Sequence, residues 1–481
     1  MHDAGGDRSQ TVAALPGLID QLRARGYKFV LASKLAGLSR DQAMPQLPLT
    51  IALFNDRVVF LTMSWVGRLL YYAFVAAIWL GVSRLLFLAG LSVWNARGER
   101  AQSVAAKPDP RHVSVIIPAF NEEKVIASTV ERILDSDHRD LEVIVVDDGS
   151  KDRTAAVVRN RFGNDHRVVL LSIANGGKAN ALNAGLKLSR GEIVVALDAD
   201  TQFQTDTIAR LVRWFSDEKV GAVAGNAKVG NRTNMVTRWQ ALEYIVAQNL
   251  ERRALAALGT LTVIPGAVGA WRRSALISLG GFQSDTLAED QDLTIGMQEH
   301  GLQVRFDSSA IAWTEAPSTF RALAKQRFRW AYGTLQCLWK YRHLTFNPRF
   351  GALGMIALPQ VWLFQIALTA FAPIADLLLI WQLISQWIAY AQHGAEFSNN
   401  DLVTVGIYYV VFVVVDLLAA IFGFLMERNE QWSLLWWLPL QRFGYRQLMY
   451  YVVVRSISTA IRGRFVGWGK LERTGTVRVA H

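Results

Sequence analysis

The chain has 481 residues, of which 51% are hydrophobic and 19% are charged, and its mean hydropathy is +0.18. Soluble enzymes of this length usually carry more charge, so the composition favours a membrane protein with a substantial water-soluble part. The aliphatic and aromatic content excludes disorder, and the single cysteine, Cys337, excludes a disulfide framework. The excess of 51 Lys+Arg over 40 Asp+Glu favours an anionic membrane surface or an anionic substrate over nucleic acid.

Residues 1–48 fit neither a signal peptide nor a regulatory tail. The stretch from His2 to Ser39 resembles the final motif, last helix and last strand of polysaccharide deacetylases of the chitin-deacetylase type. In those enzymes a histidine in a position like His2 assists catalysis. The upstream metal-binding Asp/His motifs of that family are missing, so the resemblance predicts a remnant without deacetylase activity.

The first apolar run, residues 69–94, is interrupted only by Arg84 and is long enough for one transmembrane helix, which we assign to residues 66–96. We expect Arg84 near a helix end or facing protein. Basic residues follow the run, so the positive-inside rule places residues 108–345 in the cytoplasm. That segment is rich in charge and turn residues, and we expect it to be globular.

Short β-branched runs alternate with helical segments in this globular segment. The expected strands are 113–117, 142–146, 167–173, 192–197 and 220–225, and the expected helices include 122–134, 152–162 and 178–188. Continuous apolar strands separated by helices predict a parallel sheet with both faces covered. Such sheets bind ligands beyond the carboxyl ends of their strands.

Polar residues follow four of the expected strands. They are Pro118-Ala119-Phe120-Asn121-Glu122-Glu123, Asp147-Asp148-Gly149-Ser150, Asn175-Gly176-Gly177-Lys178 and Asp198-Ala199-Asp200. Alone, each has an ordinary interpretation: a helix-capping turn, a loop without P-loop spacing, or an Asp-x-Asp of low specificity. Together they fit a diphosphate whose charge is bridged to the carboxylates by a divalent cation. We expect both Asp-x-Asp carboxylates on one face of an extended strand end.

Two further motifs lie downstream. Glu289-Asp290 enters a helix, where it either complements the helix dipole or supplies a base that takes a proton from an attacking hydroxyl. Gln326-x-x-Arg329-Trp330 lies in a basic amphipathic stretch, Phe320 to Tyr341, which by itself indicates a helix on the bilayer surface. Beside a diphosphate site, the arginine offers a forked anion clamp and the tryptophan a stacking face for a sugar.

Apolar sequence returns at 351–391, 402–426 and about 431–461, and we assign residues 351–462 to transmembrane and interface helices. The first run allows one tilted span with an interfacial helix, or two spans hinged near Pro373. Asp416 lies inside an apolar run, where a carboxylate either faces a polar cavity or ion partner or reaches the headgroups. Residues 463–481 are expected to be a cytoplasmic tail.

The ordered motifs Asp147-Asp148, Asp198-Ala199-Asp200, Glu289-Asp290 and Gln326-x-x-Arg329-Trp330 resemble those of inverting family 2 glycosyltransferases. The resemblance covers about residues 65–475 and is greatest to the processive synthases of poly-N-acetylglucosamine, chitin and hyaluronan. The endings Tyr445 to Tyr450 and Gly467 to Leu471 resemble bacterial poly-N-acetylglucosamine synthases more than cellulose synthases. The family implies an α/β GT-A fold, Rossmann-like and nucleotide-sugar-binding, in the cytoplasm, joined to an α-helical transmembrane domain.

The resemblance also implies a role for each motif, with a UDP-sugar as donor and Mg²⁺ or Mn²⁺ as cofactor. Asp290, paired with Glu289, would be the general base. Asp200 would bind the metal. The remaining assignments are Asp147 and Asp148 at the uridine, Pro118 and Glu122 at its rim, Lys178 near the diphosphate, Asp198 supporting the donor, and Gln326, Arg329 and Trp330 holding diphosphate and acceptor.

The expected function is therefore a processive synthase, multi-pass in the inner (plasma) membrane, that extends a β-linked polymer from a UDP-sugar, most simply UDP-GlcNAc, and secretes it through its own channel. Its partners would be the growing polysaccharide, the lipid bilayer and a polysaccharide deacetylase, to which such synthases are known to be fused; whether Met1 is an internal start stays open. Alternatives are a non-processive transferase with a lipid-linked acceptor, a hyaluronan- or cellulose-type synthase, and a non-catalytic export protein. The linkage, β-1,4 or β-1,6, is not fixed.

Overall fold

The computed structural model describes residues 9–44, 51–105, 109–393, 400–427 and 429–463, together with Gly475 and Val477. His2 and most of the tail 463–481, including the Gly467 to Leu471 motif, lie outside the described residues. The chain divides into two compact units, one formed by residues 1–80 and 375–412 and the other by residues 81–374 and 413–481.

The first unit is helical in its described parts. It holds α1 (Ser9–Ala24), α2 (Ala32–Leu35), α3 (Arg40–Ala43), the start of α4 (Ile51–Ala105), the end of α15 (Leu368–His393) and the start of α16 (Asn400–Met426). Ser39 begins α3 with a capping box, because its Oγ accepts from the Gln42 amide while the Gln42 side chain accepts from the Ser39 amide. In the stretch that resembles a deacetylase, the described residues form helices and turns, and residues 28–31 are in neither helix nor strand. The deacetylase resemblance stays a prediction.

Two helical segments of the described chain, Val75–Gly98 and Leu353–Leu377, are long and apolar enough to cross a membrane. Val413–Met426 is a shorter apolar helix. The expected helix at 66–96 is therefore part of a longer one, α4. Length and composition do not separate a membrane span from a buried core helix, so the multi-pass arrangement stays a prediction.

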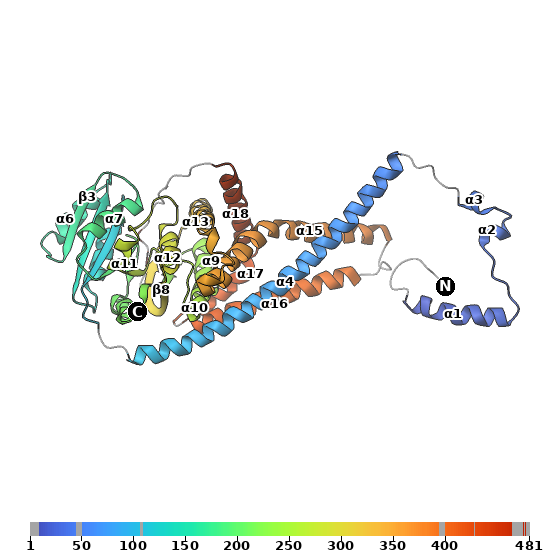
Figure 1. Ribbon diagram of the computed structural model, residues 1–481. Helices are drawn as coiled ribbons and strands as arrows, with labels where there is room; N and C mark the ends of the chain where they lie inside the picture. Colours follow the sequence, from blue (N-terminus) through green and yellow to red (C-terminus); the bar gives the residue numbers. More distant parts are fainter. Residues whose placement is uncertain are drawn as a thin grey trace. The chain divides into compact units, whose positions relative to one another are not determined.

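The second unit contains one eight-stranded sheet flanked by helices (Figure 1). Its strands are β1 (Val113–Ala119), β2 (Leu141–Asp148), β3 (Val168–Ile173), β4 (Ile193–Ala196), β5 (Gln202–Phe203), β6 (Val220–Val229), β7 (Gly269–Arg272) and β8 (Gln303–Thr314). Their order is β3-β2-β1-β4-β7-β6-β8-β5. The five expected strands are confirmed as β1, β2, β3, β4 and β6.

The prediction of an all-parallel sheet is wrong. Strands β3, β2, β1 and β4 are mutually parallel, but β7 runs antiparallel to both β4 and β6, and β5 runs antiparallel to β8. The missed strand β7 has only four residues, and β8 is interrupted by Asp307, Ser308 and Ser309, so neither has the continuous apolar run of a buried strand. The sheet therefore has a parallel half and a mixed half.

Each face of the sheet has its own buried core. On one face, β1 and β2 side chains such as Val115 and Val145 pack with α5 (Ile126–Leu134), α6 (Thr154–Phe162), α8 (Thr207–Val212) and α9 (Met235–Glu243). On the other face, Ile116 and Ile144 pack with α7 (Lys178–Leu188), α10 (Leu250–Ala257), α11 (Arg273–Ser278), α12 (Glu289–Glu299) and α13 (Phe320–Lys340). Two covered faces explain why these strands carry apolar side chains on both sides, as in Val115-Ile116-Ile117 and Val143-Ile144-Val145.

The C-terminal helical elements of this unit pack onto the same cores. The amphipathic stretch from Phe320 is confirmed as α13, and Cys337 is buried on it, as expected of a small interior residue. The expected apolar region 431–461 is divided into a 3₁₀ segment (Trp432–Trp437), α17 (Leu438–Gln441) and α18 (Tyr445–Ile461). Asp416 has an ion partner, since its Oδ2 lies 2.8 Å from Arg442 Nη2.

Candidate active site

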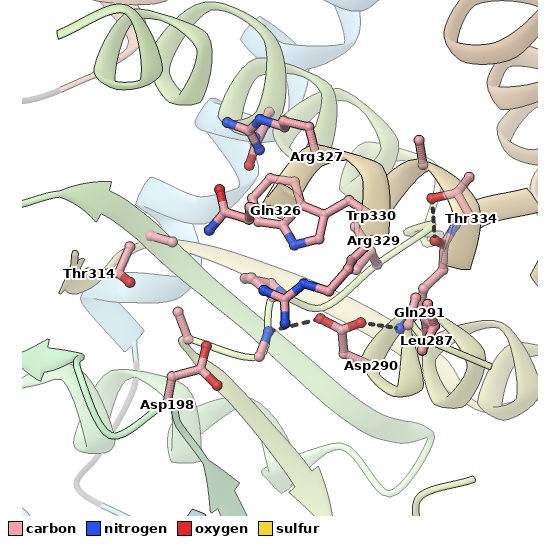
Figure 2. Close-up of a pocket in the computed structure, with 18 of the residues that line it drawn as sticks. Asp198, Leu287, Asp290, Gln291, Thr314, Gln326, Arg327, Arg329, Trp330 and Thr334 are labelled. Carbon is pink, nitrogen blue, oxygen red and sulfur yellow. Dashed lines mark hydrogen bonds between the residues drawn. The ribbon is translucent and has the colours of Figure 1, made fainter. Parts of the chain in front are cut away.

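A cavity of about 600 Å³ lies within the second unit, beyond the carboxyl ends of β1 and β2. One wall of the cavity comes from the loops that follow β1, β2 and β4, together with the start of α12. The opposite wall is helical and comes from α10, α13, α18 and the π-helix η2 (Tyr244–Asn249). The side chains of Gln326, Arg329 and Trp330 extend from α13 toward Asp290 and Asp198 (Figure 2). We refer to these surfaces below as the sheet wall and the helical wall.

The two aspartates at the end of β2 have different surroundings. Asp148 lines the cavity, and its Oδ1 and Oδ2 accept from the amides of Gly176 and Gly177 at 2.8 and 2.9 Å. Asp147 is not among the described residues that line the cavity; its Oδ1 accepts from the Ser150 amide at 3.2 Å. Gly177 has φ +88°, a conformation that L side chains rarely adopt, and this geometry lets the loop turn its amides toward Asp148.

Lys178 begins α7 and holds two acidic motifs together. Its Nζ lies 2.8 Å from Asp198 Oδ1 and 3.0 Å from Glu289 Oε1. Burial alone would lower the pKa of Lys178, but the carboxylates of Asp198, Glu289 and Asp290 outweigh it and raise the pKa above its usual value. Lys178 is therefore a fixed positive charge that links the loop after β4 to the start of α12.

The Asp-x-Asp motif lies in a turn, so the expected extended geometry is wrong. Strand β4 ends at Ala196, and the amide of Thr201 donates to the carbonyl of Asp198 at 3.0 Å. Asp198 and Asp200 both line the cavity, and Asp200 is only 3% exposed. The turn thus brings both carboxylates to the cavity without the strand geometry that the spacing predicted.

Asp290 is half-buried at the start of α12, and its carboxylate is oriented by the backbone. Its Oδ2 accepts from the Gly266 amide at 3.1 Å and its Oδ1 from the Gln291 amide at 2.8 Å (Figure 2). Burial and the negative charge of Glu289 raise the pKa of Asp290 to about 6, although Lys178 opposes them. A carboxylate with such a pKa is ionised near neutral pH and is basic enough to accept a proton.

The loop that holds Asp290 contains a glycine that sequence analysis did not single out. A Cβ added to Gly266 would lie 2.7 Å from Lys178 Nζ, 3.6 Å from Asp290 Oδ2 and 3.8 Å from Asp198 Oδ1. A side chain here would force Lys178 Nζ to move, whereas its contacts with the two aspartates would be ordinary, so the glycine matters for the position of Lys178. In the sequence, the signal was the Pro265-Gly266 pair, which marks a turn but not its neighbours.

The helix α13 presents the Gln326-x-x-Arg329-Trp330 motif. All three motif residues line the cavity, Gln326 is buried, and its Oε1 has no hydrogen-bond partner among the described residues. Arg327 lies under the motif, with its guanidinium 4.1 Å from the centre of the Trp330 ring and Nη2 2.5 Å from Glu243 Oε2. Tyr445 of α18 completes this group through hydrogen bonds with both Glu243 and Arg327.

Polar residues that sequence analysis did not identify as site residues also line the cavity: Glu243, Tyr244, Gln248, Glu251 and Arg252 on helical segments, and Glu315 in the loop after β8. Arg84, expected near a helix end or facing protein, faces protein, because its Nη2 lies 2.8 Å from Glu251 Oε2. No short motif marks these residues, since the elements that carry them meet partners that are distant in sequence.

The carboxylates of the sheet wall fit part of a divalent-cation site. No group of three or more His, Cys, Asp or Glu side chains in the described part of the chain could hold a metal ion by itself. Asp198 and Asp200 nevertheless offer the oxygen ligands that Mg²⁺ and Mn²⁺ prefer, and Mg²⁺ is commonly held by one or two carboxylates together with substrate phosphates. The donor set therefore fits a cation that arrives with a diphosphate.

Comparison with known proteins also indicates similarity to glycosyltransferases. Residues 110–333 match the family model "Glycosyltransferase like family 2". The poly-beta-1,6-N-acetyl-D-glucosamine synthase of Staphylococcus epidermidis is 28% identical over 305 residues, which make up 63% of this chain and 70% of that protein. "Probable glycosyltransferase YdaM" of Bacillus subtilis is 37% identical over 238 residues, 48% of this chain and 56% of that protein.

A solved structure has a similar fold. The mannosyltransferase PcManGT from Pyrobaculum calidifontis, in complex with GDP-Man and Mn²⁺, covers 78% of this chain with 98% of its own, at a TM-score of 0.51 and 22% identity. This likeness supports a GT-A-like α/β fold with a mixed sheet. At this identity it shows the fold alone.

Proposed function

We propose, from the match of residues 110–333 to the family 2 glycosyltransferase model, that the chain is a membrane-embedded processive β-glycosyltransferase. It would extend a polysaccharide from a UDP-sugar, with inversion, and move the product through a channel of its own. The observation that carries the proposal is one cavity lined by the strand-end carboxylates Asp148, Asp198 and Asp200, by Asp290 and by the Gln326-x-x-Arg329-Trp330 motif. These motifs are up to about two hundred residues apart in the sequence, so their meeting in one cavity is what a donor site facing an acceptor site requires.

In the proposed reaction, Asp290 is the general base. Its carboxylate takes the proton of an acceptor hydroxyl while the hydroxyl oxygen bonds to the anomeric carbon of the donor. The bond from that carbon to the β-phosphate oxygen breaks, and UDP leaves with the electron pair. The backbone amides of Gly266 and Gln291 orient the carboxylate, and the pKa of about 6 keeps it ionised yet basic at neutral pH.

The donor would lie along the sheet wall. Asp147 and Asp148 are assigned to the uridine, Pro118 and Glu122 to its rim, Lys178 to the diphosphate region and Asp198 to donor support. Asp200, with Asp198 beside it, would hold Mg²⁺ or Mn²⁺, which supplies positive charge that stabilises the departing diphosphate. Arg329, a forked cation on the facing wall, would contribute to the same stabilisation.

The acceptor would lie along the helical wall. Arg327 covers one face of the Trp330 ring, and Trp330 also lines the cavity and is 38% exposed, so a surface of the indole is open for stacking against a sugar. A glycan held by stacking need not dissociate between additions, which supports processive extension. The names of the staphylococcal relatives support UDP-GlcNAc as donor and a poly-N-acetylglucosamine product.

The proposed setting is the inner (plasma) membrane, with the catalytic domain in the cytoplasm and the acceptor polysaccharide and the bilayer as partners. The two apolar helical segments support it. A polysaccharide deacetylase, to which residues 1–48 would be related, is the further proposed partner.

The experiment is incubation of the purified protein with individual UDP-sugars and a divalent cation. Product identified by mass spectrometry and linkage-specific glycosidases gives the sugar and the linkage. A polymer formed from UDP-GlcNAc is the expected result. Transfer of one or a few residues to a lipid-linked acceptor would replace the proposal with a non-processive transferase, and absence of transfer from every UDP-sugar would overturn it.

A further inference from the structure

Two adjacent arginines on α10 are both buried but have different surroundings. Arg253 is 5% exposed, and its Nη2 lies 3.0 Å from Glu427 Oε1. Arg252 is 8% exposed and forms no salt bridge with any carboxylate in the described part of the chain. Its Nη1 and Nη2 donate only to the side-chain oxygens of Asn249 and Gln248, each at 3.3 Å, and its Nε has no partner among the described residues.

Arg252 belongs to the cavity, whereas Arg253 does not line it among the described residues. Its cavity-lining neighbours in the sequence include Tyr244, Gln248 and Glu251, so it stands on the helical wall, where the acceptor is proposed to bind. Burial lowers the pKa of Arg252 from its usual value, although Tyr244, Glu251 and Asp290 oppose this effect. The negative charge of Asp290 thus acts on the Arg252 guanidinium, so the proposed base and this arginine share one electrostatic environment.

A buried guanidinium without a carboxylate partner is unfavourable, because desolvation of the charge is not compensated. Such a group is retained where a ligand supplies the missing acceptor. Three other basic residues of the cavity, Arg84, Lys178 and Arg327, are already paired with carboxylates. Arg252 differs from them in having no carboxylate partner among the described residues, while its Nε also has no hydrogen-bond partner there.

The surrounding charges restrict the ligand. Among the described residues that line the cavity, nine carboxylates face five basic side chains. A sugar carboxylate near Glu251 and Asp290 would be repelled, while an ammonium group would be attracted unless a local cation opposes it. A neutral oxygen that accepts a hydrogen bond is not repelled by the carboxylates and is still attracted by the Arg252 guanidinium. Among the neutral groups of common sugars, the acetamido carbonyl is the strongest hydrogen-bond acceptor.

We propose that Arg252 is an acceptor-specificity residue, which donates to the carbonyl oxygen of an N-acetyl group on the acceptor glycan and repels the ammonium group of a de-N-acetylated sugar. This inference rests on the proposed function, since it takes the acceptor to be a glycan on the helical wall. It adds a selection that the donor alone does not provide: chains whose end has lost its acetyl group would not be extended.

The test measures binding of two oligosaccharides to the full-length, UDP-loaded protein in detergent, by tryptophan fluorescence. One is a β-linked GlcNAc oligomer, and the other is its de-N-acetylated counterpart of equal length and linkage. At neutral pH the wild type is expected to bind the acetylated oligomer at least ~10-fold more tightly, the effect of 1.4 kcal/mol. At a pH high enough to neutralise the amines, the preference should shrink.

Two variants separate charge from hydrogen bonding. Arg252→Gln removes the cation and should reduce the preference several-fold or reverse it, because the carboxylates then attract the ammonium groups. Arg252→Lys keeps the cation and should keep the preference for the acetylated oligomer. The readout is a ratio of two affinities for the same folded variant, with thermal denaturation as the check on folding.

An unchanged ratio in Arg252→Gln, a wild type that binds both oligomers equally, or a wild type that binds neither would each overturn the inference. None of these results contradicts polymer synthesis from a UDP-sugar. Conversely, failure of every UDP-sugar to support transfer sinks the proposed function, while the affinity ratio is still measured. The two failures are therefore distinguishable.

Discussion

The two walls of the cavity are held in place by different means. On the sheet wall, Asp148 and Asp290 are oriented by backbone amides, and Lys178 links residues that directly follow strands or begin helices. On the helical wall, side chains orient one another over long sequence separations, such as the 167 residues between Arg84 and Glu251 and the 202 between Tyr445 and Glu243. Changes in the C-terminal helices should therefore affect the acceptor side while leaving the donor side intact.

The largest expected effect lies on the sheet wall. Asp200→Asn should abolish turnover without loss of the fold, because it removes a charged ligand from the proposed diphosphate-bound cation. UDP release with Mg²⁺ or Mn²⁺ measures turnover, and thermal denaturation checks the fold. Asp217→Asn, an exposed carboxylate outside the cavity, is the control and should behave as wild type. Near-normal UDP release by Asp200→Asn would sink the metal assignment.

The next effect concerns the proposed base. Asp290→Asn should slow sugar transfer at least ~10²-fold, the usual scale for loss of a positioned general base, while UDP still binds. Because burial raises the pKa of Asp290, the ionised carboxylate costs folding free energy at neutral pH, and the variant should melt no lower than wild type. Glu289→Gln should cost less activity. A reversed order of the two losses would exchange the roles of the pair.

On the helical wall, Trp330→Ala should lower polymer synthesis about tenfold or more, the effect of 1.4 kcal/mol in acceptor binding, with little change in UDP affinity. The remaining product should be short oligosaccharide, and donor hydrolysis should persist. Calorimetry of UDP binding measures the effect on the donor side, and gel filtration of the product measures the effect on the acceptor side. Unchanged polymer length would count against an acceptor site on this wall and favour the non-processive alternative.

The pH dependence gives a smaller effect, again on the sheet wall. With Asp290 as base, UDP release should fall as the pH drops through about 6, because the carboxylate becomes protonated. Glu289→Gln removes the neighbouring negative charge, so the pKa of Asp290 should decrease and the acid limb should move to lower pH. Initial rates between pH 5 and pH 8, at saturating donor, measure the limb. A limb that stays in place would show that another group controls it.

The difference between the walls also explains what the sequence could predict. The motifs after β1, β2, β3 and β4 were readable because parallel strands bring their carboxyl ends to one edge, so positions along the chain translate directly into positions in space. The start of α12 and the helix α13 were recognised by charge and amphipathic spacing. All these predictions depend on patterns within short stretches of sequence, and the structure contains β1 to β4, α12 and α13 at the expected places.

The remainder depends on tertiary contacts that no local pattern carries. The antiparallel β7 has four residues, Gly266 lies against Lys178 and Asp290, and the partner of Arg253 that Arg252 lacks is 174 residues away. The turn at Asp198 likewise replaced the expected extended geometry, because β4 ends two residues before the motif. Side-chain pairs and strand directions that depend on residues so far apart in the sequence can be seen only in the folded chain.

The smallest expected effect tests the helical wall through a residue outside the cavity. Tyr445 hydrogen-bonds to both Arg327 and Glu243, and Arg327 covers one face of Trp330. Tyr445→Phe removes only the hydroxyl, so the free energy of unfolding should fall by about 1 kcal/mol, the usual net value of one hydrogen bond.

Because the support of Arg327 loosens in that variant, the orientation of Trp330 becomes less fixed, and the product chains should shorten several-fold while UDP affinity stays unchanged. The matched control is Tyr451→Phe on the same helix α18, an exposed tyrosine whose hydroxyl accepts from Arg455 at 3.3 Å. Product length and UDP affinity are measured for both variants. If Tyr445→Phe weakened UDP binding as much as it shortened the polymer, the C-terminal helices would act on both walls, and the separation between donor and acceptor sides would be lost.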